Sequence, residues 1–170
     1  MKNKKNLWLR IFLFLAAAII ILSLFSDVLM PNDPNATNAM RIKEAPSAEY
    51  PFGTDDLGRC VLSRVLSGSK TSIFCALILV AATAVFGSAA GMLCGYYGGA
   101  ADSIVMRIID GIMAFPQMVL AIAVAGMLGG GMLNAMLALG FASWTPYARL
   151  ARSRVIALKR EEFVLAARIS

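Results

Sequence analysis

Histidine is missing from this sequence and charged residues are scarce. None of the 170 residues is histidine and 15% are charged, whereas soluble domains carry about 25% charged residues. Without histidine the chain lacks the side chain most often used for proton transfer near neutral pH and for metal binding. Its three cysteines are not the even set that a disulfide framework requires. We therefore expect no catalytic residues, no bound cofactor and no metal site.

Apolar residues make up 59% of the chain, and its mean hydropathy is +0.72. Four apolar stretches follow one another, at residues 11–30, 72–97, 116–128 and 132–146. Because about 20 apolar residues cross a bilayer as a helix, this pattern predicts an all-α, polytopic transmembrane helical bundle in contact with membrane lipid. We expect about four spans to be present.

The formal net charge of +6 is concentrated at the two ends of the chain, before the first apolar stretch and after the last. Positively charged loops mark the cytoplasmic side of a membrane, so both ends are expected in the cytoplasm. The glycines at 129–131 then make a tight external turn between two short spans. No basic stripe interleaved with aromatic residues is present, so we expect no nucleic-acid binding. A cleaved signal peptide is the alternative for residues 11–30, but no small-residue cleavage pattern follows them closely.

Three regions follow from this reading. Residues 1–30 form a cytoplasmic stub and the first span, and residues 72–170 form the start of a transmembrane core that ends in a cytoplasmic helix. Residues 31–71 are polar and hold four of the six prolines, which predicts an extracytoplasmic loop. Within it, Thr54 can cap a helix with Asp55 and Asp56 in its first turn. The apolar positions from Leu57 to Leu66 then predict an amphipathic helix in the membrane interface.

Small residues and rare charges mark the second half of the chain. Glycine recurs at every fourth position, at Gly87, Gly91, Gly95 and Gly99, a spacing that lets two membrane helices approach closely. Between Thr71 and Arg149 the charged residues are Asp102, Arg107 and Asp110. Charges near hydrocarbon usually face a bundle interior or an interface, and we expect Arg107 to pair locally with one of the two aspartates.

Three groups of residues together resemble one membrane-protein family. The first is Phe-Gly-Thr-Asp-Asp-Leu-Gly-Arg at 52–59, and the second combines Gly-Tyr-Tyr-Gly-Gly at 95–99 with Asp102, Met-Arg at 106–107, Asp110 and Phe-Pro at 115–116. The third comprises Trp144, Tyr-Ala-Arg at 147–149, Arg152 and residues 162–168. From residue 31 onward the chain resembles the C-type permease subunit of the peptide and nickel ABC importer family, an inner-membrane component of binding-protein-dependent transport.

The resemblance implies a multi-pass protein of the cell inner membrane that is not itself an enzyme. It also implies that residues 72–170 are the start of a permease core ending in the cytoplasmic coupling helix, and that the four spans belong to a larger set. In that family ATP is hydrolysed on separate cytoplasmic ATPase subunits, an extracytoplasmic substrate-binding protein delivers the cargo, and a second permease subunit completes the pore. The residues that correspond to the ATPase-coupling loop are Glu162, Phe163, Leu165, Ala166, Ala167 and Arg168.

The chain departs from the family pattern in two places. Cys60 replaces the usual aspartate after the Gly-Arg pair, where we expect an exposed thiol. Leu165 replaces the usual glutamate of Glu-Ala-Ala, and the expected glycine would fall after Ser170, so the chain is expected to be truncated at the coupling loop and to transport nothing alone. The sequence around Leu165 and Ser170 favours nickel or a metal chelate as cargo; dipeptides or oligopeptides are the alternative.

Two other classes of function remain open at this point. A membrane-embedded enzyme would need a polar catalytic cluster, for which Asp102, Arg107 and Asp110 are the candidates. A pore or assembly protein that works without ATP would need none. An ATPase that co-purifies with the chain would separate the importer from both.

Overall fold

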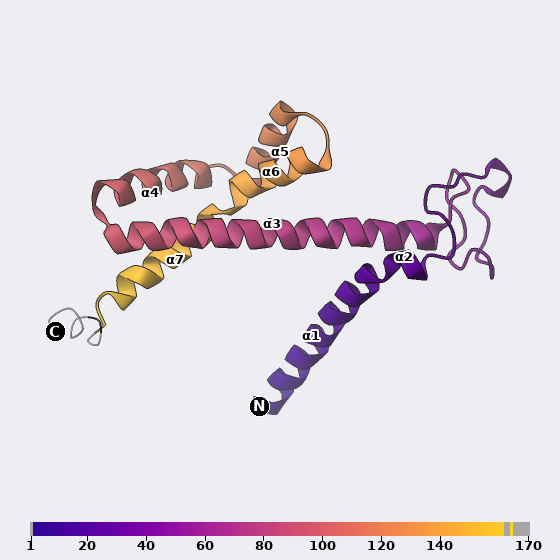
Figure 1. Cartoon of the computed structure of the whole chain (residues 1–170), viewed down its shortest axis with the longest axis horizontal. Coiled ribbons are helices and arrows are strands. Elements are labelled where there is room, and N and C mark those ends of the chain that lie inside the picture. The colour runs from indigo at the N-terminus through magenta and orange to yellow at the C-terminus, as the bar shows by residue number, and fades with distance from the viewer. Residues whose placement is uncertain (1, 162–163, 165–170) are drawn as a thin grey trace. The chain divides into compact units, whose positions relative to one another are not determined.

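The computed structural model describes residues 2–161 and residue 164. Its helices are α1 (Lys2–Leu24), α2 (Ser26–Leu29), the 3-10 helix η1 (Ala39–Arg41), α3 (Val61–Tyr97), α4 (Gly99–Met113), α5 (Gln117–Leu128), α6 (Met132–Ser143) and α7 (Thr145–Leu158) (Figure 1). Over the described residues the only β pairing is an isolated bridge between Thr54 and Cys60. The predicted all-α class is confirmed.

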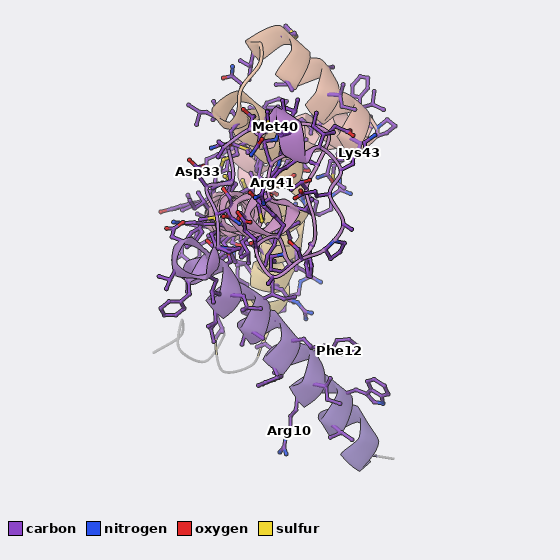
Figure 2. All side chains as sticks on the ribbon, turned by 90° about the vertical axis from the view of Figure 1, so that its right-hand side faces the viewer. Arg10, Phe12, Asp33, Met40, Arg41 and Lys43 are labelled. Atoms are coloured by element: carbon purple, nitrogen blue, oxygen red, sulfur yellow. The ribbon has the colours of Figure 1, made fainter. Side chains whose placement is uncertain are left out.

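The chain divides into two compact units, Met1–Ala76 and Leu77–Ser170. In the first, α1 is a long apolar helix whose side chains are mostly exposed from Leu7 onward. Figure 2 shows Arg10 and Phe12 projecting outward from it, and Phe12 is 62% exposed. An apolar helix this open is suited to lipid or to other helices and not to water.

Residues 31–60 form a folded loop in which two segments pair through their backbones. The amide of Asn38 donates to Leu57 O at 3.1 Å, that of Lys43 to Asp55 O at 3.2 Å, and that of Thr54 to Glu44 O at 3.2 Å. Met40 and Lys43 lie on its outer surface (Figure 2), and Met40 is 96% exposed. The polar loop predicted between the first two spans therefore has a defined structure.

The predicted helix start near Thr54 is wrong, because the helix begins only at Val61 and runs on without a break to Tyr97. The location of its first turns in the membrane interface stays a prediction. The Thr54 hydroxyl caps nothing: it donates to Arg41 O and accepts from the amide of Glu44. Asp55 holds a turn through the amides of Leu57 and Arg59. Between Val61 and Tyr97 no proline interrupts the helix, and Gly68 is tolerated within it, so the predicted second span is the continuation of this same helix.

The second unit contains the end of α3 and helices α4 to α7. Gly98 and Gly99 make the turn from α3 into α4 with φ of +68° and +69°, values that favour glycine. Helices α4 and α5 meet at an angle of 91° across the break at Ala114–Pro116. Helices α5 and α6 pack side by side as a hairpin, joined by the predicted glycine turn at 129–131.

Two helices, Leu7–Leu24 and Val61–Tyr97, are long and apolar enough to cross a membrane, or up to three if the bent pair α4–α5 counts as one span. Helices α5 and α6 have 12 residues each, which is about 18 Å at 1.5 Å per residue against about 30 Å of hydrocarbon. The predicted helix pair around the glycine turn is thus present but short, and four crossings stay a prediction.

Candidate functional site

A seam of small residues joins α3 to α7. Gly87, Gly91 and Gly95 face α7, and we call them the glycine seam. A Cβ added at Gly91 would lie 2.0 Å from Ala148 O, one at Gly87 would lie 2.4 Å from Trp144 O, and one at Gly95 would lie 3.0 Å from Arg152 O. These are backbone atoms, so only glycine lets the two helices approach this closely.

The fourth predicted member, Gly99, does not belong to the seam. It lies beyond the end of α3, at the start of α4, and nothing comes within 4 Å of a Cβ added there. The four-residue spacing holds only while one helix continues, and Gly98 turns the chain one residue earlier.

Two ion pairs join α4 to α7. Arg152 donates two hydrogen bonds to the Asp102 carboxylate in a bidentate pair, Nε to Oδ1 at 2.5 Å and Nη2 to Oδ2 at 2.6 Å. Arg149 Nη2 donates to Asp110 Oδ1 at 2.6 Å. The inner pair is sheltered, with side-chain exposures of 13% for Asp102 and 31% for Arg152. The outer pair is open, with 60% for Asp110 and 49% for Arg149.

The expected pairing of Arg107 with a neighbouring aspartate is wrong, since among the described residues both aspartates take their partners from α7. Arg107 is exposed. At 3.6 residues per turn it lies five residues, or about 140° around the helix, from Asp102. The two side chains therefore lie on different faces of α4, and Asp102 pairs with Arg152 of α7 instead of with Arg107.

The same stretch of α7 serves both contacts. Ala148 is fully buried against the seam, and Arg152 lies one turn further along. The two arginines, three residues apart, share the side of α7 that reaches α4. Sequence reasoning found both arginines in the family motif but not their role. The three-residue spacing of the two arginines, which places them on one side of α7, is the signal that could have indicated their pairing with α4.

The corner between the helices is held by a few polar contacts. Gln117 Nε2 donates to Ser143 Oγ at 2.8 Å, which ties the start of α5 to the end of α6. At the far end of that hairpin, the Asn134 amide donates to the carbonyl oxygens of residues 128, 129 and 130 at 2.8, 3.3 and 3.1 Å. These carbonyls would otherwise lack partners at a helix end.

An apolar groove of about 480 Å³ lies between α3 and α6. Phe86 and Trp144 meet edge to face along it, with ring centroids 5.2 Å apart. Thr83 contributes a hydroxyl, but that hydroxyl donates to Leu79 O within its own helix. The groove therefore offers apolar contact and no polar recognition.

Past α7, Lys159 Nζ donates to Tyr96 O at 2.7 Å and lies 5.7 Å from the centre of the Tyr96 ring. The end of α7 is thereby fastened to the end of α3. The residues predicted to couple to an ATPase follow next. Those six (Glu162, Phe163, Leu165, Ala166, Ala167 and Arg168) lie outside the described residues.

In the loop region, Asp55 is the central anion. It accepts from the amides of Leu57 and Arg59, from the Arg59 guanidinium at 2.8 Å and from Arg64 at 2.8 Å. Burial raises the pKa of this carboxyl, but the two backbone amides and the Arg59 guanidinium outweigh it and hold the pKa below its ordinary value.

Cys60 is not the exposed thiol that the sequence predicted. It is 2% exposed, because its bridge to Thr54 folds residues 53–60 back onto the start of α3. Burial raises the pKa of the thiol, while hydrogen bonds from Ser63 and Asn32 lower it further than burial raises it. The net pKa lies below the ordinary value, in a thiol closed to reagents.

Comparison with known proteins places much of this region in one protein family. Residues 87–170 match the family model described as "Binding-protein-dependent transport system inner membrane component". The chain is 36% identical to the dipeptide transport system permease protein of Alkalihalophilus pseudofirmus, covering 97% of this chain and 54% of the relative.

Two relatives from Escherichia coli K12 also match most of the chain. The probable D,D-dipeptide transport system permease protein is 42% identical over 90% of this chain and 53% of its own length. The nickel transport system permease protein is 35% identical over 95% of this chain and 58% of its own length. The chain thus spans about half the length of the curated relatives it matches.

Proposed function

The chain belongs to the permease family of peptide and nickel ABC importers, the inner-membrane components of binding-protein-dependent transport, and on that premise we propose that it works as part of the membrane-spanning permease subunit of an ATP-driven importer. One observation carries the proposal: the range that matches the family model, residues 87–170, includes the residues that fasten α7 to both α3 and α4. A helix held on two sides is suited to pass a displacement into the bundle.

The proposed mechanism starts beyond the end of α7. Residues 162–168 dock on a cytoplasmic ATPase, which is a separate subunit, and its closure displaces α7. The displacement enters the bundle through the glycine seam and through Arg152. Small shifts are transmitted because packed helices are not continuously deformable.

The remaining partners follow from the same proposal. A second permease subunit completes the pore, and an extracytoplasmic substrate-binding protein delivers the cargo to the loop at residues 31–60. The chain lies in the cell inner membrane with its N-terminus in the cytoplasm. The long exposed apolar surfaces of α1 and α3 support contact with lipid and with further helices.

The cargo is proposed as one of two classes. Nickel or a metal chelate is the expectation from the sequence at residues 165–170, and one relative is a nickel permease by name. A dipeptide or oligopeptide is the alternative, supported by the relatives named for dipeptides. Uptake of nickel and of a labelled dipeptide, measured separately in cells that keep the partner subunits, distinguishes them.

The coupling role is tested by Ala167→Trp in the assembled complex. A bulky side chain on the proposed docking surface should lower substrate-stimulated ATP hydrolysis while membrane insertion stays intact. Ala157→Trp, at an exposed site on α7, is the matched control and should leave hydrolysis unchanged. Unchanged stimulation in Ala167→Trp would reject the docking role, and a chain that co-purifies with no ATPase would favour an ATP-independent pore.

A further inference from the structure

The sheltered pair Asp102–Arg152 has a chemistry that packing alone does not require. A carboxylate and a guanidinium placed together between helices gain little over a well-packed apolar pair, because desolvation offsets their attraction. A bidentate pair does fix how α4 and α7 are aligned along each other, since both nitrogens of Arg152 must meet both oxygens of Asp102. An apolar contact between the two helices, which can slide, does not fix this alignment.

The position of the pair says which motion it controls. Arg152 lies on α7 one turn beyond Ala148, the residue that abuts Gly91 of α3. Asp102 lies in the first turn of α4. The chain then bends by 91° at Ala114–Pro116 before α5 begins. Helix α7 is thus held against α3 by close packing and against α4 by the ion pair. Along the chain from Asp102, the first non-helical backbone is that bend.

We propose that Asp102 and Arg152 are positioning residues for transport: they form a strut that makes α4 move with α7, so that displacement of α7 reaches the α4–α5 corner. This inference rests on the proposed function. The open pair Asp110–Arg149 is assigned no such role, because its single hydrogen bond does not fix a register as the two bonds of Asp102–Arg152 do. The pair Asp110–Arg149 is therefore a matched control for Asp102–Arg152, because both join an aspartate of α4 to an arginine of α7.

The functional test compares Asp102→Asn with Asp110→Asn in the assembled importer. Asp102→Asn should lower the amount of substrate imported per ATP hydrolysed by about fivefold or more, the low end of the usual range for coupling between two sites. Asp110→Asn should leave this ratio within about twofold, as expected of an exposed pair. The charge-reversed double variant Asp102→Arg with Arg152→Asp should recover at least part of the ratio, which a merely disruptive substitution would not.

A spectroscopic test reads the strut without transport. Spin labels at Ser103→Cys on α4 and Ser153→Cys on α7, both exposed sites, are placed in a chain whose three native cysteines are replaced by alanine or serine. The α4–α7 distance should keep one narrow distribution in the parent, broaden in Asp102→Asn and stay narrow in Asp110→Asn. Equal broadening in both variants, or in neither, overturns the strut.

The two tests separate the possible failures. If the parent complex imports nothing, the proposed function fails, while the label distances in the purified chain still decide whether the strut exists. If import occurs and Asp102→Asn keeps the parent ratio of substrate to ATP, the positioning role is overturned although the importer stands. Nucleotide trapping adds one more check: a parent α4–α7 distance that changes on trapping would contradict a rigid strut.

Discussion

Replacing Gly91 by alanine is the sharpest perturbation of the α3–α7 seam. The added Cβ would lie 2.0 Å from Ala148 O, 2.7 Å from its carbonyl carbon and 2.8 Å from its Cα. Ordinary van der Waals contact begins near 3.4 Å, so the helices must separate by about 1.4 Å, since 3.4 − 2.0 = 1.4. Every atom in the way is backbone, so no side-chain rotation relieves the clash.

The separation should destabilise the fold by about 1–3 kcal/mol, the usual penalty for an overpacked core. Gly111→Ala is the matched control, because nothing lies within 4 Å of a Cβ there and alanine is better than glycine inside a helix by about 0.5–1 kcal/mol. The two variants insert the same methyl group and should shift stability in opposite directions.

The assay is thermal unfolding of the purified chain in mild detergent, followed by helical circular dichroism. Across the seam, the loss should follow the three distances, largest for Gly91→Ala, intermediate for Gly87→Ala and smallest for Gly95→Ala. Equal melting of Gly91→Ala and Gly111→Ala, or a reversed order along the seam, would refute the close approach of α3 and α7.

Three further predictions concern the loops. Met40→Cys, with the three native cysteines kept, should be labelled from outside intact cells by a membrane-impermeant maleimide. Cys60 should react only after unfolding. Labelling of Met40→Cys from the cytoplasmic side alone would reverse the topology. Folding lowers the pKa of Asp55, so the stability that its carboxylate gives the loop should be complete above about pH 4, the ordinary carboxyl value. That stability should be lost as the pH falls through the folded pKa. The rate of limited proteolysis of the loop measures it, and Asp55→Asn should abolish this pH dependence. Asn134→Ala should free the three carbonyls of the glycine turn and speed hydrogen exchange there, whereas unchanged exchange would deny the amide its role.

The helices and the close-approach face could be read from the sequence, because both are periodic features of one segment. Apolar length located α1 and α3, and the spacing of Gly87, Gly91 and Gly95 marked the side of α3 that a partner helix touches. The periodicity could not say where a helix begins when two signals compete. Thr54 looked like a cap until the structure gave its hydroxyl other partners in the loop.

Partners distant in sequence were the part that the residues alone could not provide. Asp102 and Arg152 are 50 positions apart; helix spacing argues against Arg107 as the cation for that carboxylate, but nothing in the sequence singles out Arg152 in its place. The burial of Cys60 is of the same kind, because it depends on a bridge to Thr54. Such features arise only when separate segments fold together.

The Asp102–Arg152 pair also has an electrical consequence. Moving one elementary charge across a membrane potential takes about 2.3 kcal/mol per 100 mV, but a paired carboxylate and guanidinium carry no net charge. The pair itself can therefore move in the membrane field without electrical work. In Asp102→Asn the cation of Arg152 would remain alone, and its movement would add a dependence on voltage.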